Sequence, residues 1–184
     1  MLTDTERATL LEIARHSIAY GLQHGEAAPV TVSDYASPLQ ENKATFVTLT
    51  IQGKLRGCIG SLQAYRPLVE DVAHNAFAAA FQDPRFPRLT RQEFAPLQLH
   101  ISILSPPEPI KFKDEQDLLD QLRPEMDGLI LEEGQFRGTF LPQVWESLPE
   151  PKQFLNHLKQ KAGLPPDYWS KTIKLQRYRV EEFS

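Results

Sequence analysis

The sequence predicts an α+β fold, in which antiparallel strands and amphipathic helices follow one another without the regular strand–helix–strand winding of a parallel sheet. Apolar residues recur at helical spacing near the N-terminus, which indicates an amphipathic helix. Apolar and polar residues alternate over residues 47–51 and 97–103, a pattern typical of half-buried strands. Residues 128–131 and 138–141 flank a turn sequence and predict a β-hairpin.

In the first half of the chain, helix-capping residues, glycines and prolines indicate where helices and strands begin and end. Thr3 and Glu6 have the spacing of a capping box, and Gly25 supplies a stop, so we expect a helix between them. Residues 26–43 contain prolines and small polar residues typical of an irregular surface segment. The strand at 47–51 should turn at 52–54 into a second strand from Leu55 to Ile59.

A broad apolar face predicts the next helix, with Pro67 as its first residue and Asp83-Pro84 as its end. Further along, we expect a short helix at 114–122, the hairpin, and a short helix opened by Pro142. A helix at 151–162 and a final strand at 173–180 complete the chain. Its 184 residues suit one domain spanning residues 1–184.

Composition restricts the function classes. The formal net charge is −4, which offers no general attraction to phosphate, so nucleic acid is not expected as a partner although Arg85, Arg88 and Arg91 lie close in sequence. No apolar run approaches the ~18 residues of a membrane span, and the N-terminus lacks the basic and apolar parts of a signal peptide. The single cysteine excludes an internal disulfide and a thiolate-rich metal site within this chain. We therefore expect a cytoplasmic protein without membrane association.

Residues 55–60 are the sharpest local signal, because the only thiol, Cys58, lies among Arg56, Gly57 and Gly60. As a nucleophile, Cys58 would need a nearby positive charge such as Arg56, and the amides of Gly57 and Gly60 could steady developing negative charge. The same pattern fits a buried cysteine that packs as a small hydrophobe beside the glycines of a tight turn.

Two further sets are candidates for substrate binding. Asp83 and Arg85 lie on a loop stiffened by prolines, where Arg85 could grip a carboxylate or phosphate, or the two could simply fix the loop. Thr139 and Gln143 could present a hydroxyl and an amide, or cap the local backbone.

The sequence assigns no metal and no cofactor. Glu70, Asp71 and His74 lie three and four positions apart on one expected helix and could share a metal, but such residues are more often a solvated face. The phosphate-loop, dinucleotide-binding and serine-hydrolase motifs are absent.

The segments at 55–60, 75–89, 128–145 and 161–169 resemble those of the AMMECR domain family, whose prokaryotic members are called protein A of the AmmeMemoRadiSam system. The resemblance implies a larger and a smaller lobe, an antiparallel sheet flanked by helices, and a cleft at the turn of residues 55–60. It implies two partners, a Memo-type protein and a radical S-adenosylmethionine protein. Similar proteins often have a second cysteine where this chain has Lys159, so Cys58 would have to act alone.

The sequence thus supports two hypotheses. One is a cytoplasmic enzyme centred on Cys58 that acts on a small anionic substrate. The other is a non-catalytic interaction or regulatory module that works with the Memo-type or radical S-adenosylmethionine protein.

Overall fold

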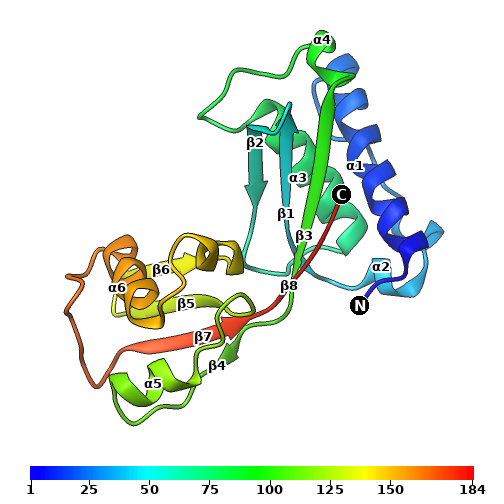
Figure 1. Ribbon diagram of the computed structural model, residues 1–184. Coiled ribbons are helices and arrows are strands. Elements are labelled where there is room, and N and C mark those ends of the chain that lie inside the picture. The colour runs from blue at the N-terminus through cyan, green and yellow to red at the C-terminus, as the bar shows by residue number, and fades with distance from the viewer. The chain divides into compact units, whose positions relative to one another are not determined.

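The computed structural model describes residues 1–184, which form two compact units (Figure 1). Unit 1 comprises residues 1–104 and 181–184, and the smaller unit 2 comprises residues 105–180. Each unit has its own hydrophobic core and its own four-stranded sheet. The α+β class is confirmed, and the antiparallel sheet expected from the sequence is present once in each unit.

Unit 1 contains two long helices and a sheet in the order β2-β1-β3-β8. The helices are α1 (Asp4–His24) and α3 (Leu68–Phe81), and the strands are β1 (Ala44–Ile51), β2 (Lys54–Gly60), β3 (Leu97–Leu104) and β8 (Val180–Phe183). The predicted capping box of α1 is present at Thr3 and Glu6, and Gly25 ends the helix in the left-handed conformation. Gln52 and Gly53 both have positive φ, as the tight turn between β1 and β2 requires.

One face of the unit 1 sheet packs against both helices. Val47, Leu49, Leu99 and Ile101 belong to the same buried cluster as the inner residues of α1 and α3. Gly21 of α1 lies against the rings of Phe77 and Phe81 of α3, where a larger residue would collide. Because strand side chains alternate between faces, the polar residues between the core positions point to the face without these helices (Figure 1).

Short elements connect these parts and were not expected from the sequence. They are the 3₁₀ helix η1 (Val32–Asp34) and the helices α2 (Ser37–Gln40) and α4 (Arg91–Phe94). Pro67 is the N-cap of α3 instead of its first helical residue, since its ψ of 141° is extended. The prediction of a strand over residues 55–59 is confirmed. The hexapeptide of residues 55–60 therefore belongs to β2 and does not form a turn.

Unit 2 contains a sheet in the order β4-β7-β5-β6. Its strands are β4 (Glu108–Pro109), β5 (Gly128–Glu133), β6 (Phe136–Phe140) and β7 (Lys174–Tyr178), and its helices are α5 (Glu115–Gln121), the 3₁₀ helix η2 (Pro142–Glu146) and α6 (Pro151–Ala162). The predicted hairpin is β5–β6, and the expected final strand is divided between β7 and β8, which belong to different sheets.

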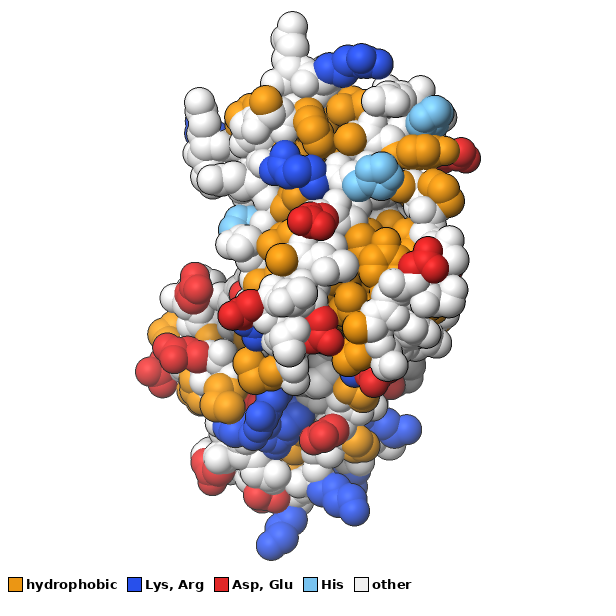
Figure 2. All heavy atoms as spheres, turned by 90° about the vertical axis from the view of Figure 1, so that its right-hand side faces the viewer, with side chains coloured by type: hydrophobic (Ala, Val, Ile, Leu, Met, Phe, Trp, Pro, Cys, Tyr) orange, Lys and Arg blue, Asp and Glu red, His pale blue; other side chains and the backbone are white.

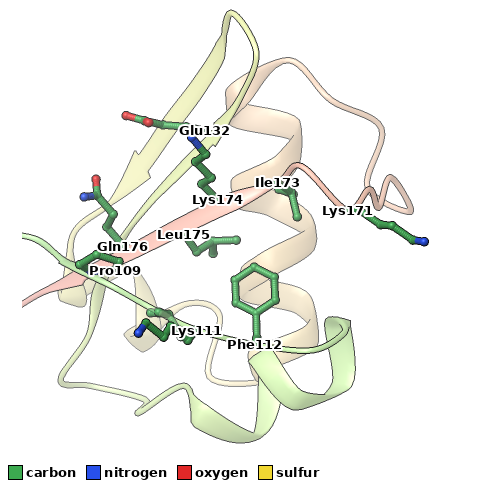
Figure 3. A pocket seen from close by; sticks show the side chains of 10 residues that line it. Pro109, Lys111, Phe112, Glu132, Lys171, Ile173, Lys174, Leu175 and Gln176 are labelled. Atoms are coloured by element: carbon green, nitrogen blue, oxygen red, sulfur yellow. The ribbon is translucent and has the colours of Figure 1, made fainter.

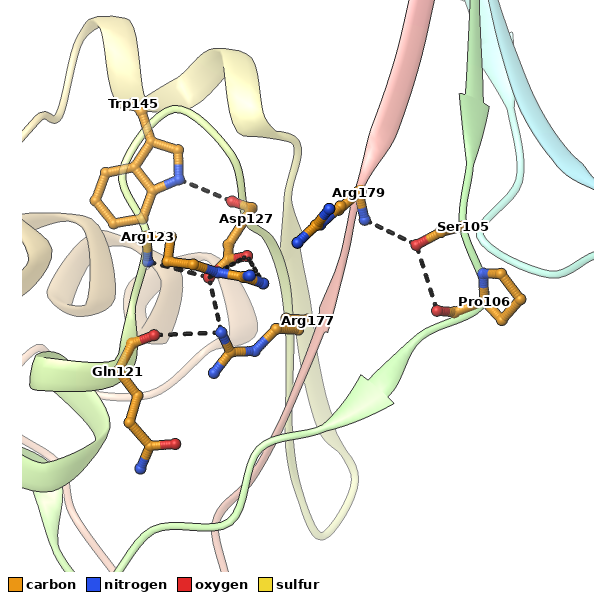
Figure 4. Close-up of polar contacts among 8 residues, drawn as sticks. All are labelled: Ser105, Pro106, Gln121, Arg123, Asp127, Trp145, Arg177 and Arg179. Atoms are coloured by element: carbon orange, nitrogen blue, oxygen red, sulfur yellow. Dashed lines mark hydrogen bonds and ion pairs between the residues drawn. The ribbon is translucent and has the colours of Figure 1, made fainter. Parts of the chain in front are cut away.

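A buried carboxylate joins several segments of unit 2 (Figure 4). Asp127 is fully buried, and its oxygens accept hydrogen bonds from the guanidinium groups of Arg123 and Arg177 at 2.8 and 3.3 Å. The Trp145 indole donates to the Asp127 carbonyl at 2.7 Å. A buried charge is tolerated when it is paired and hydrogen-bonded in this way, so this cluster is structural.

Candidate functional site

Cys58 lies on β2, the edge strand of the unit 1 sheet. Its register partner on β1 is Thr48, and its N–H points away from β1 and donates to the carboxylate of Asp83 at 2.9 Å. Cys58 and Thr48 are therefore a non-hydrogen-bonded pair, the kind in which cross-strand side chains lie closest. Cys58 Sγ and Thr48 Oγ1 are 3.1 Å apart, and the cysteine is half-buried.

The loop after α3 seals the outer edge of β2 with side chains in place of another strand. Asp83 accepts hydrogen bonds from the N–H of Cys58 and from the backbone and guanidinium of Arg85. The Arg85 guanidinium also donates to the Cys58 carbonyl at 3.3 Å. Both backbone groups of Cys58 are thus satisfied, and an edge strand that is covered in this way is protected from pairing with other chains.

Asp83 and Arg85 form an ion pair in which each group shifts the pKa of the other. The hydrogen bonds from Arg85 hold the pKa of the Asp83 carboxyl well below its ordinary range. The pKa of Arg85 is raised, chiefly by its hydrogen bond to Asp83 and to a smaller extent by charge interaction with Cys58. The Arg85 side chain is nevertheless 55% exposed, whereas that of Asp83 is 2% exposed. Arg85 can therefore meet a ligand, while Asp83 acts through its neighbours.

The Arg56 side chain contacts the inner side of the segment at residues 87–93. The register of β1 and β2 shifts at this residue, and such a bulge re-aims the side chain of the extra residue. Its guanidinium is buried, pairs with Glu93 at 2.7 Å and donates to the Pro87 carbonyl at 2.9 Å. The hydrogen bond from Arg56 lowers the pKa of Glu93 to about 2. The geometry gives Arg56 the role of anchoring residues 87–93 to β2.

Gly57 and Gly60 are explained by close packing. A Cβ atom on Gly57 would collide with the carbonyl oxygen of Ala79 in α3. A Cβ atom on Gly60 would collide with the carbonyl oxygen of Thr45 and the ring of Phe46. The amide cradle expected from these glycines stays a prediction, and so does the cleft at residues 55–60.

The sheet face opposite α1 and α3 carries a row of three polar side chains, Cys58, Thr48 and His100. Thr48 is the register partner of Cys58 on one side and of His100 on the other, so the three share one face. His100 is exposed, and two strand spacings put its Cα roughly 10 Å from that of Cys58. A second row lies beside the first on the same face, with Leu55 on β2, Thr50 on β1 and Gln98 on β3. The alternating pattern predicts that Thr48 and His100 are outward-facing, but only the strand order brings them beside Cys58.

The α3 residues considered for a metal do not face a common site, since Asp71 is buried and His74 is exposed. Asp71 is buried and accepts hydrogen bonds from Thr45 at 2.6 Å, Asn75 at 3.0 Å and Arg66 at 3.0 Å. His74 is exposed, and partial desolvation lowers its pKa. No group of three or more His, Cys, Asp or Glu side chains in the structure is arranged to hold a metal ion.

Thr139 and Gln143 belong to unit 2. The Thr139 hydroxyl donates to the Leu129 carbonyl at 2.8 Å and contacts the Tyr178 hydroxyl at 3.0 Å, where burial raises the pKa of Tyr178 to about 12. Gln143 is exposed on η2. Thr139 therefore has a local structural role, and its binding role stays a prediction.

The surface gives no sign of a basic stripe on the face nearest α1. Figure 2 shows acidic, basic and apolar side chains interspersed on its upper part. None of the helices combines the length and the hydropathy that a bilayer crossing requires.

Comparison with known proteins decides the family. The AMMECR1 family model matches residues 11–183. The chain belongs to the AMMECR1 family. The resemblance of the hexapeptide and the loop after α3 to this family is thereby confirmed.

Three similar proteins are archaeal. A protein of Methanothermobacter thermautotrophicus is 34% identical over 188 residues, covering 99% of this chain and 95% of the relative. A Methanocaldococcus jannaschii protein is 38% identical over 162 residues, covering 84% and 79%. The crystal structure of an uncharacterised protein from Pyrococcus horikoshii has a TM-score of 0.83 at 35% identity and covers 95% of this chain and 88% of the other. The solved structure shares the fold of this chain, and the names of all three proteins state no activity.

Proposed function

We propose that this AMMECR1-family protein is an enzyme whose site lies on the face of the unit 1 sheet opposite α1 and α3, with Cys58 as nucleophile toward a small anionic substrate. The observation that carries the proposal is the contact of the half-buried Cys58 thiol with the Thr48 hydroxyl, in a residue whose backbone carbonyl accepts from the half-exposed guanidinium of Arg85. A nucleophilic thiol needs partial exposure and a nearby positive charge, and Cys58 has both.

Each side chain has a distinct part. Arg85 binds the anionic group of the substrate, because its guanidinium lies against the backbone of Cys58 and remains half exposed to a ligand. The Thr48 hydroxyl contacts the thiol, and the imidazole of His100, the register partner of Thr48, takes the thiol proton through that hydroxyl once the His100 side chain turns toward it. Asp83 and Arg56 hold the loop and the strand in place and touch no substrate.

A pair of alkylating reagents tests the anionic preference. Iodoacetate and iodoacetamide react with a thiolate in the same way: the sulfur bonds to the CH₂ carbon and iodide leaves. They differ in charge. We expect the ratio of the iodoacetate rate to the iodoacetamide rate at Cys58 to be higher in the folded protein than in the urea-unfolded chain. Intact-mass measurement follows both reactions.

Arg85→Gln supplies the decisive variant, and Arg91→Gln is the control, since Arg91 is exposed on α4 and has no ion pair. Arg85→Gln should reduce the rate ratio to that of the unfolded chain, and Arg91→Gln should leave it unchanged. A ratio that is equal in folded and unfolded protein contradicts the proposed substrate class.

A second candidate function is the interaction module, with a Memo-type or radical S-adenosylmethionine protein as partner. It is favoured by Leu55, which is 44% exposed on the same sheet face, in the family's hexapeptide. Contiguous exposed apolar patches mark contact surfaces, and Leu55 would be the centre of such a surface on this face. On this account, a Memo-type protein co-purifies with the wild-type chain and not with Leu55→Asp, while equal recovery of both contradicts it.

A further inference from the structure

A cavity in unit 2 lies where two segments separate (Figure 3). β4 pairs with β7 over only two residue pairs, and the Ile110 N–H adds a hydrogen bond to the Leu175 carbonyl at 2.9 Å. Beyond this point, Lys111 and Phe112 leave β7 toward α5. A cavity of about 550 Å³ opens there, which is within the range of small-molecule sites.

The opening is held by contacts on both sides. Gln121 of α5 donates to the Lys111 carbonyl at 2.9 Å, which fixes the departing segment. The ring of Phe112 packs against Trp169, with 5.6 Å between ring centroids. On the other side, the Ile173 N–H is bonded to the Ser170 hydroxyl at 3.1 Å. Because these contacts are already made, the cavity is preformed and a ligand would pay little ordering cost.

The lining combines an apolar floor with a basic rim. Phe112, Ile173 and Leu175 point toward the middle of the cavity in Figure 3. Lys111, Lys171 and Lys174 belong to the lining, come from two separate segments and take part in no ion pair, and the Lys171 side chain extends away from the apolar residues in Figure 3. The acidic lining residue Glu132 is paired with Arg137 at 3.2 Å.

The ammonium groups of Lys111 and Lys174 beside one apolar hollow, with Lys171 at its margin, create a local positive potential in a chain whose net charge is −4. A neutral apolar ligand would gain nothing from the positive potential, and an inorganic anion would leave the apolar side chains exposed to water. From this cavity we infer a binding site in unit 2 for a small organic anion with an aromatic or short aliphatic body. The inference is independent of Cys58, which lies in unit 1.

Two fluorescent dyes test this site directly. 1-Anilinonaphthalene-8-sulfonate carries a sulfonate, and N-phenyl-1-naphthylamine is the same molecule without it. We expect saturable binding of the sulfonate at one site, with roughly tenfold lower affinity for the neutral dye, as a few screened charge pairs would give. Equal affinities for the two dyes would overturn the inference, because the lysines would then contribute nothing.

Variants separate this cavity from the rest of the surface. Lys111→Gln combined with Lys174→Gln should lower the sulfonate affinity roughly tenfold and leave the neutral dye unaffected. The control combines Lys54→Gln and Lys113→Gln, which remove the same charge from exposed positions outside the lining. A loss of affinity that is the same in both double variants would overturn the assignment to this cavity.

Competition with the sulfonate dye then shows which anionic group the site prefers. 1-Naphthaleneacetate and 1-naphthyl phosphate offer a carboxylate and a phosphate on the same ring system. Displacement of the sulfonate dye by either one supports the site and identifies its preferred anionic group. Displacement by neither overturns the inference.

Discussion

Replacement of Asp83 by alanine tests the loop that seals β2. The Asp83 side chain is almost completely buried, and it accepts hydrogen bonds from the N–H groups of Cys58 and Arg85 and from the Arg85 guanidinium. Alanine leaves the Cys58 N–H without its partner, while the exposed Arg85 regains water. Because an unpaired buried donor costs about 1–3 kcal/mol and the loop also loses its ion pair, we expect a loss of about 2–4 kcal/mol.

Thermal unfolding followed by circular dichroism measures this loss. For a chain of this length, 2–4 kcal/mol corresponds to a decrease in Tm of roughly 5–15 °C. Asp34→Ala is the matched control, since Asp34 is exposed on η1 and the structure gives its side chain no hydrogen bond. A decrease for Asp83→Ala no larger than that of the control would refute the account of the loop.

The dependence on pH has a definite sign. The pKa of Asp83 is lower in the folded protein than its ordinary value, so its contribution to stability is present above about pH 4 and is lost as the pH falls through the folded pKa. The stability difference between wild type and Asp83→Ala should therefore narrow progressively below about pH 4. A difference that is constant down to strongly acidic pH would mean that charge has no part in it.

Three further predictions concern packing and ion pairs. Gly57→Ala should destabilise the protein by about 1–3 kcal/mol, because the added methyl group collides with the backbone of α3; a wild-type urea midpoint would contradict this. Glu93→Gln breaks the pair with Arg56, and since the folded pKa of Glu93 is about 2, its deficit in urea unfolding should be full above about pH 5 and shrink toward pH 2. Lys159 is fully buried against Glu115 at 2.5 Å, so Glu115→Leu should cost more in Tm than Lys159→Met, because only the former leaves a buried ammonium without its closest partner.

The helices and hairpins were predictable because their signals are local. The capping box at Thr3 and the stop at Gly25 act within one turn of α1, and the turn at Gln52-Gly53 depends on the residues that occupy it. The division into two sheets was not predictable, since it depends on which strands pair across long separations. Tyr178 and Val180 follow the same alternating pattern, yet they enter different sheets.

The candidate site divides in the same way. The sequence identifies Cys58 and, separately, Asp83 and Arg85 as candidate site residues, and the structure brings these three into contact. The sequence does not distinguish an arginine that can reach a ligand from a structural one, because that depends on exposure: Arg85 is half exposed, while Arg56 is buried in a bulge. The row of Cys58 with Thr48 and His100 requires the strand register, which no local pattern encodes.

The central claim is that Cys58 presents a reactive thiol on the face of the unit 1 sheet opposite α1 and α3. The most direct test compares the rate of Cys58 alkylation by iodoacetamide in the native protein with the rate in the urea-unfolded chain, followed by intact mass at a series of pH values. The account predicts complete native labelling at a rate comparable to or faster than that of the unfolded chain, and slower labelling in His100→Gln. A thiol that is labelled only after unfolding would make Cys58 a packing residue and contradict the account.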